Sequence, residues 1–113
     1  MKDDSVFLDH ILDAIGQIGE YIAGLTFEEF LETRLVQDAV VRQLEIIGEA
    51  TKSLSSYTTG KYPHIPWKAI AGMRDKLIHV YFGVDLEEVW NTVVRDVPDL
   101  KAVVELIMDM DRS

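Results

Sequence analysis

A short stretch near the middle of the chain, GMRDKLIHVYFGVD (residues 72–85), carries the densest polar chemistry in the sequence. Arg74 is permanently charged, and its planar guanidinium can bind a phosphate through two parallel hydrogen bonds. His79 can give or take a proton near neutral pH, because an unperturbed imidazole has a pKa of about 6.5. Asp75 lies four residues before His79, so on a helix its carboxylate would support the imidazole. Tyr81 adds a hydroxyl that can donate to a phosphate or be modified.

An arginine and a histidine are the smallest set of side chains that metal-free RNA cleavage needs. RNA supplies its own nucleophile, the 2′-hydroxyl, so the protein need only move protons and stabilise charge on the phosphoryl oxygens. The three histidines, His10, His64 and His79, are scattered, and no cluster at metal-ligand spacing is visible. We therefore expect no metal or other cofactor. The spacing leaves a second interpretation open, in which Arg74, Asp75 and His79 form a salt-bridged helix rim.

Helix geometry adds a constraint on how these residues would work together. Five residues separate Arg74 from His79, which places them about 140° apart around an ideal helix. Tyr81 lies seven residues from Arg74 and nearly eclipses it, about 20° away. For the two side chains to act together, either the Arg74 side chain reaches around the helix toward His79, or the helix is irregular, or a second subunit completes the site. We favour a symmetric homodimer, because one histidine in each chain makes a two-proton reaction difficult.

The first element that the sequence predicts is an amphipathic helix over residues 6–25. Its apolar residues recur at three- and four-residue steps for about five turns. Gly16 and Gly19 each weaken such a helix by up to about 1 kcal/mol relative to alanine. We therefore interpret the two glycines as the mark of a close helix crossing.

A second helix is predicted to begin at Thr26, because Glu29 follows three residues later as in a capping box. Its apolar stripe continues for about 30 residues, to Ser56. The segment SSYTTGKYPHIPW (residues 55–67) is predicted to be the main loop. Its two prolines, one glycine and cluster of Ser and Thr residues are typical of chain that stops a helix.

Three further helices complete the prediction. A third helix covers residues 67–82, and Asp85 then caps a fourth over residues 86–95. Pro98 either kinks this helix or lies in the first turn of a fifth, over residues 99–110. No strand pattern is visible. We expect an all-α fold, an antiparallel four-helix bundle with an additional short C-terminal helix, that forms a single domain over residues 1–113.

Composition limits the classes of function. The 113 residues are 48% hydrophobic and 27% charged, as in a globular chain, and none is a cysteine, which fits a reducing cytoplasm. We expect no signal peptide and no membrane-spanning helix, since no apolar stretch approaches about 18 residues. The net charge of −9 argues against broad, non-specific nucleic-acid binding. If RNA is the substrate, the basic groups must be concentrated near it.

The motif and its surroundings resemble a known family. Arg74-x4-His79 resembles the Arg-x(4–6)-His motif of HEPN-domain ribonucleases, and the continuation to Tyr81 matches the Arg-x4-His-x-Tyr form of the HepT-like toxins. The flanking segments IPWKAIAGMRD and YFGVDLEEVW, together with LEIIGEA in the second helix, agree with this branch. The resemblance covers nearly the whole chain.

This resemblance implies a helical dimer whose motif lines a cleft between the subunits. It implies a metal-independent endoribonuclease that is the toxin of a two-gene, type VII-like toxin–antitoxin system. Arg74 would bind and polarise the phosphate, His79 would be the general acid and base, and Asp75 would give polar support. The antitoxin would be a small nucleotidyltransferase that adenylylates Tyr81. The toxin would form a homodimer, or a higher assembly together with the antitoxin. The alternative is a non-catalytic helical partner, or modification target, of such a nucleotidyltransferase.

Four residues outside the motif also carry predictions. Trp67 and Trp90 are expected to anchor the core and not to stack on bases. Arg42 and Glu49 lie seven residues apart on the second helix, hence on one face. That face is either a salt-bridged dimer surface or a wall of the cleft.

Overall fold

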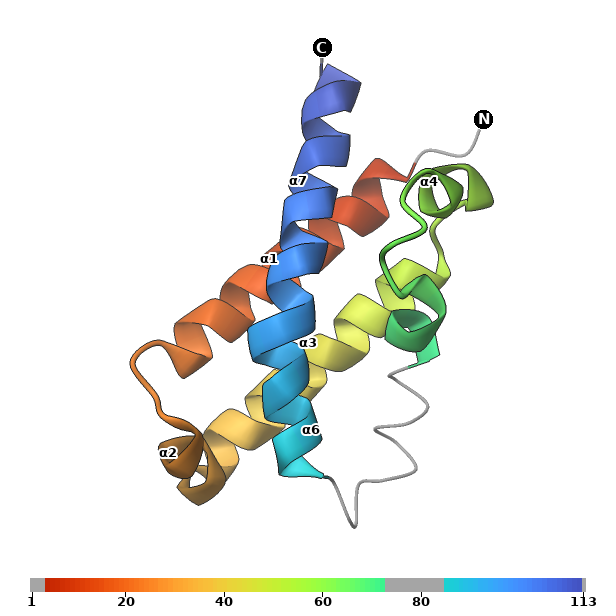
Figure 1. The fold of residues 1–113 in the computed structure, drawn as a ribbon. Coiled ribbons are helices and arrows are strands. Elements are labelled where there is room, and N and C mark those ends of the chain that lie inside the picture. The colour runs from red at the N-terminus through yellow and green to blue at the C-terminus, as the bar shows by residue number, and fades with distance from the viewer. Residues whose placement is uncertain (1–3, 73–84, 113) are drawn as a thin grey trace.

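The computed structural model describes residues 4–72 and 85–112, and side chains as far as residue 110. Every element in these two segments is helical and none is a strand, which confirms the all-α prediction. Figure 1 shows the arrangement: α1 (Ser5–Ile22) and α3 (Arg34–Lys52) run antiparallel, and α7 (Val97–Arg112) crosses them. None of the described helices is long and apolar enough to span a membrane.

The core lies where α1, α3 and α7 meet. The most extensive packing between helices is that of α1 on α3, and α7 also packs on α1. The largest side chains that are fully removed from solvent come from α1, α2, α3 and α7, and they are Phe30, Leu8, Ile11, Ile18, Leu44, Ile47, Leu100, Val40 and Val104. Their three- and four-residue spacing within each helix is the pattern from which the helices were predicted.

The predicted second helix is in fact two helices. A capping box opens α2 (Phe27–Glu32): the Thr26 hydroxyl accepts from the Glu29 N–H at 3.1 Å, and the Glu29 carboxylate accepts from the Thr26 N–H at 3.0 Å. This start was predicted. The prediction of an uninterrupted helix to Ser56 was wrong. Thr33 leaves helical geometry at φ −116° and ψ 86°, and α3 begins at Arg34. The Gln37 amide donates to the carbonyls of Phe30 and Leu31 and so satisfies the end of α2.

The predicted loop over residues 55–67 contains a short helix, α4 (Ser56–Lys61). Ser55 caps it, and the carboxylate of Asp4 reaches the same end from the start of the chain. Asp4 accepts from the Ser55 hydroxyl at 2.7 Å and from the Thr58 hydroxyl at 2.6 Å. The Asp4 part of this network could not be read from local sequence, because Asp4 lies more than 50 positions away. The segment from Tyr62 to Pro66 is not helical.

Helical geometry resumes at residues 67–72, as predicted from Pro66. Trp67 packs against the core, and its indole N–H donates to the carbonyl of Tyr62 at 2.9 Å. Ile70, three residues on, is 4% exposed. The beginning of the predicted third helix is therefore fixed on the core by Trp67 and Ile70. Residues 73–82 of that prediction lie outside the described residues.

The C-terminal helices form one helical run, α6 (Leu86–Asn91), a π-helical segment η1 (Thr92–Asp96) and α7. Asp85 caps α6 as predicted, since its carboxylate accepts from the Glu88 N–H at 3.1 Å. Pro98 lies in the first turn of α7, directly after η1, where its missing N–H removes a helical hydrogen bond. The ring of Trp90 packs on Phe30 with centroids 5.2 Å apart, so both tryptophans contact the core as expected.

The two glycines of α1 do not mark a crossing within the described chain. Both residues are exposed, and a Cβ built on Gly16 or Gly19 meets no atom within 4 Å among the described residues. The interpretation of a close helix crossing between described helices was therefore wrong. Gly24 has a different role, because its φ of 76° closes the turn after α1 in a conformation that favours glycine.

Candidate functional site

The four residues predicted to carry the chemistry are Arg74, Asp75, His79 and Tyr81. All four lie in residues 73–84, outside the described residues, so their roles stay predictions. The described chain resumes at Asp85. The functional geometry that the structure does provide is that of the surfaces on either side of this segment.

Both sides of the segment are held by well-packed chain. On the N-terminal side, Ile70 is buried two residues before Gly72. On the C-terminal side, Asp85 caps α6 and Val89 is 4% exposed. A rigid anchor at each end is what a catalytic segment needs if its side chains are to be positioned reproducibly.

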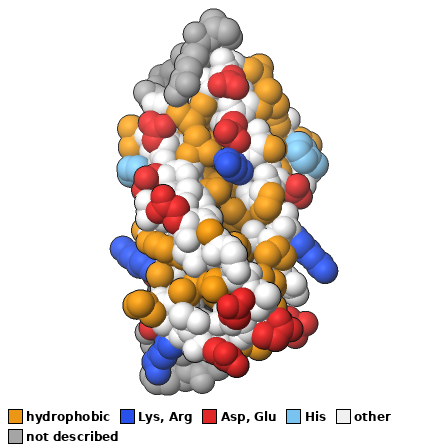
Figure 2. Space-filling view, turned by 90° about the vertical axis from the view of Figure 1, so that its left-hand side faces the viewer, with side chains coloured by type: hydrophobic (Ala, Val, Ile, Leu, Met, Phe, Trp, Pro, Cys, Tyr) orange, Lys and Arg blue, Asp and Glu red, His pale blue; other side chains and the backbone are white. Residues whose placement is uncertain are grey.

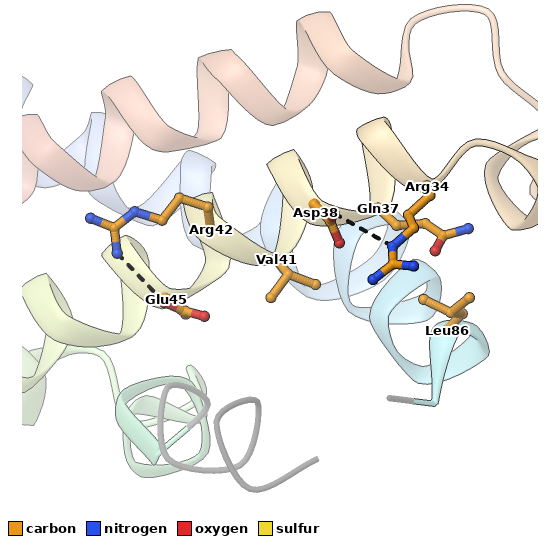
Figure 3. Close-up of a pocket in the computed structure, with 7 residues that line it drawn as sticks. All are labelled: Arg34, Gln37, Asp38, Val41, Arg42, Glu45 and Leu86. Carbon is orange, nitrogen blue, oxygen red and sulfur yellow. Dashed lines mark hydrogen bonds and ion pairs between the residues drawn. The ribbon is translucent and has the colours of Figure 1, made fainter. Parts of the chain in front are cut away.

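A hollow of about 420 Å³ lies on the outer face of α3 and is closed at one end by the start of α6 (Figure 3). Such a volume is within the range of small-ligand sites, although this hollow is open to solvent. The side chains that line it are Arg34, Gln37, Asp38, Val41, Arg42, Glu45 and Leu86. Val41 is largely buried and Leu86 partly so, and the two give the hollow an apolar floor between polar walls.

Two ion pairs follow the length of this hollow. Arg34 Nε lies 3.8 Å from Asp38 Oδ2, and Arg42 Nη1 donates to Glu45 Oε2 over 3.5 Å. The arginine side chains are 83% and 69% exposed respectively. Long, solvent-exposed pairs within one helix contribute little stability, because water screens them and side-chain entropy opposes them. The two guanidinium groups are therefore available to another anion at low cost.

A second hollow of about 370 Å³ continues along α3 toward its C-terminus and reaches α1. Arg42 and Glu45 line both hollows, which makes the outer face of α3 one continuous groove. His10 and Glu49 belong to the second part. The prediction that Arg42 and Glu49 share a face is confirmed.

The sequence interpretation did not single out Arg34 or Asp38. Arg34, Asp38 and Arg42 follow one another at four-residue steps, and an alternating charge pattern of this kind on one helix face is a readable signal. This signal did not depend on the true start of α3, because the predicted second helix already contained all three residues. Within the described residues, no group of three or more His, Asp or Glu side chains is placed to hold a metal ion.

Comparison with known proteins gives consistent matches. The family model described as Ribonuclease HepT-like matches residues 11–107. A Methanocaldococcus jannaschii protein named "Putative RNase" is 45% identical over 111 residues, which cover 97% of this chain and 92% of that protein. A Thermococcus cleftensis protein named "Probable ribonuclease HepT" is 48% identical over 99 residues, or 88% of this chain and 90% of its own. A Caldanaerobacter subterraneus protein, also named "Putative RNase", is 42% identical over its whole length. No solved structure gave a comparable match.

Proposed function

This chain belongs to the HepT-like ribonuclease family, and from that membership we propose that it is a metal-independent endoribonuclease. The observation that carries the proposal is the family match over residues 11–107, which contain Arg74-x4-His79-x-Tyr81. The relatives named as RNases match nearly the same span. The proposed substrate is RNA, and the proposed location is the cytoplasm.

The proposed reaction uses the RNA as its own nucleophile. His79 accepts the proton of a 2′-hydroxyl, whose oxygen attacks the adjacent phosphorus. The bond from phosphorus to the 5′-oxygen breaks, and that oxygen leaves with a proton, so the products are a 2′,3′-cyclic phosphate and a 5′-hydroxyl. Arg74 neutralises charge that builds up on the phosphoryl oxygens, and Asp75 supports the polar surroundings.

The reaction needs one group to accept a proton and another to donate one. The motif supplies a single histidine per chain, and its helical spacing sets Arg74 and His79 about 140° apart on an ideal helix. A homodimer meets both requirements, because a two-fold axis brings two copies of the motif together. We therefore propose a homodimer as the active form.

The proposed regulation acts on Tyr81. A cognate nucleotidyltransferase, as the antitoxin of a toxin–antitoxin pair, would transfer AMP to the tyrosine hydroxyl. The added phosphate would compete for Arg74, which on an ideal helix would lie on the same face as Tyr81, and the adenosine would fill space next to it. Tyr81→Phe is expected to keep RNA cleavage but to resist silencing. A mass increase of one or more AMP units on the Tyr81 peptide would report the modification.

The test of the nuclease is cleavage of defined RNAs in EDTA by the parent protein, His79→Ala and His64→Ala. The matched control, His64→Ala, removes an exposed histidine that lines neither hollow of the α3 groove and is expected to cleave like the parent. His79→Ala and Arg74→Ala are expected to lose cleavage while they keep the helical circular-dichroism signal. Undiminished cleavage by His79→Ala would remove His79 from the mechanism. An inactive parent that still binds and is modified by a nucleotidyltransferase would favour the non-catalytic alternative.

A further inference from the structure

RNA binding by this chain faces an electrostatic difficulty. Asp and Glu outnumber Lys and Arg by 20 to 11. On the face of the molecule in Figure 2, Lys and Arg side chains are separated from one another by acidic and apolar ones. A surface of that kind does not follow an RNA backbone, which needs several cations along one line.

The groove on α3 differs from that face, because two basic side chains lie together in it. Arg34 and Arg42 line the same hollow. The other described Lys and Arg side chains line neither this hollow nor its continuation, and they are Lys52, Lys61, Lys68, Arg95 and Lys101. We propose that Arg34 and Arg42 form a phosphate-binding subsite that holds the RNA backbone beside the cleavage site. This inference rests on the proposed function.

The spacing of the two arginines suits a nucleic-acid strand. Eight residues of α-helix rise about 12 Å, and Arg34 and Arg42 lie that far apart along α3. This separation is several times the axial rise of about 3.4 Å per nucleotide in a stacked DNA strand, so the two guanidinium groups would contact different phosphates of one RNA strand. Val41, between the two arginines on α3, offers an apolar surface for a ribose or a base, and Leu86 adds a second one at the end of the hollow next to Arg34.

The donors of the two arginines are available. A guanidinium has five N–H donors in a planar fork that matches a phosphate. Among the described residues, Arg34 has one contact, to Asp38 at 3.8 Å, and Arg42 has one, to Glu45 at 3.5 Å. A backbone phosphodiester carries one negative charge, as a carboxylate does, and it can accept two parallel N–H bonds from a guanidinium, whereas each of these carboxylates has only one long contact to its arginine.

The groove also lies within reach of the proposed catalytic segment. Leu86, at one end of the hollow, follows Tyr81 by five residues. Five residues of chain span at most about 17 Å. RNA held on α3 would therefore be positioned within a few nucleotides of the motif.

The test measures binding of a short fluorescein-labelled single-stranded RNA as a function of salt, in the His79→Ala background that keeps the RNA intact. Arg34→Gln and Arg42→Gln are each expected to weaken binding roughly 3- to 10-fold. Each should also lower the slope of log affinity against log salt by about 0.7, the value for one contact to a single strand. The matched control is Arg95→Gln, an exposed arginine outside the groove, which should leave both quantities unchanged.

Substitution of an acidic residue that pairs with one of these arginines should change RNA affinity in the opposite direction. Asp38→Asn removes the carboxylate that competes for Arg34, so RNA binding should tighten roughly twofold or more. If the groove instead binds a protein, the assembly mass by light scattering should fall in Arg42→Gln while RNA affinity stays unchanged, and the proposal would be wrong.

The two proposals fail in different ways. A parent protein that cleaves RNA in EDTA, with Arg34→Gln and Arg42→Gln indistinguishable from Arg95→Gln, would refute the subsite and leave the nuclease intact. A parent that neither binds nor cleaves RNA would refute both.

Discussion

The inner and outer faces of α3 differ in residue type and in burial. The inner face carries Val40, Leu44 and Ile47, each at most 1% exposed and packed among side chains of the other helices. The outer face carries charged residues whose ion pairs are long and whose arginines, Arg34 and Arg42, are mostly exposed to solvent. The comparison indicates that the inner face stabilises the fold, whereas the ion pairs of the outer face contribute little to stability.

The strongest test of this division makes one substitution on both faces. Leu44 is 1% exposed and Leu35 is 81% exposed, and both belong to α3. Leu44→Ala should lower the free energy of unfolding by about 3 kcal/mol, because it leaves a cavity as well as losing apolar burial. Leu35→Ala should change it by less than about 0.5 kcal/mol. Urea unfolding followed by circular dichroism measures both, and similar losses would show that the outer face is also covered.

A polar group inside the molecule gives the next largest effect. Asp4 is 8% exposed, comparable to the least buried residues of the core, and it accepts hydrogen bonds from Ser55 and Thr58. Asp4→Ala should cost about 2 to 3 kcal/mol, since it leaves partly buried donors without their acceptor. Asp9→Ala, on the exposed surface of α1, is the control. Equal unfolding midpoints for the two variants would show that the Asp4 network adds nothing to stability.

The helix cap at Thr26 should have an intermediate effect, although it lies on the surface. Its hydroxyl accepts from the Glu29 N–H at 3.1 Å. Thr26→Ala should lower stability by about 1 kcal/mol, because this N–H loses its partner. Thr26→Ser keeps the oxygen and should retain most of the stability. If Thr26→Ser and Thr26→Ala had the same melting temperature, the lost hydrogen bond of the cap would not be the cause of the lower stability.

The smallest effect should be a gain. Gly16→Ala and Gly19→Ala should each raise stability by up to about 1 kcal/mol, because alanine favours a helix and its Cβ meets nothing described. Thermal unfolding of the two variants, together with light scattering, measures this. A lower melting temperature or a smaller assembly would show that the glycine face of α1 packs against another chain.

The parts of the fold that the sequence predicted correctly are those with local causes. The Thr26 capping box and the Asp85 cap each depend on residues three positions apart. The elements that the sequence missed involve contacts over longer separations, of six or seven residues at the end of α2 and more than 50 at the start of α4. The end of α2 is satisfied by the amide of Gln37, and the start of α4 by a carboxylate at Asp4.

The candidate site divides in the same way. Arg74, His79 and Tyr81 were identified from a local motif and its family resemblance, neither of which needs a three-dimensional contact. The groove was only half visible in the sequence: the shared face of Arg42 and Glu49 was predicted, but not the contribution of Leu86 from another helix. Periodicity locates a residue on one helix and says nothing of which other helix lies opposite.

The central claim is that Arg74 and His79 cleave RNA through its own 2′-hydroxyl. The most direct measurement is mass spectrometry of the ends formed when the parent protein and His79→Ala act on one RNA in EDTA. We predict 2′,3′-cyclic phosphate and 5′-hydroxyl ends from the parent, and none of them from His79→Ala. Ends that carry a 3′-hydroxyl and a 5′-phosphate, or the same cyclic ends from His79→Ala, would contradict it.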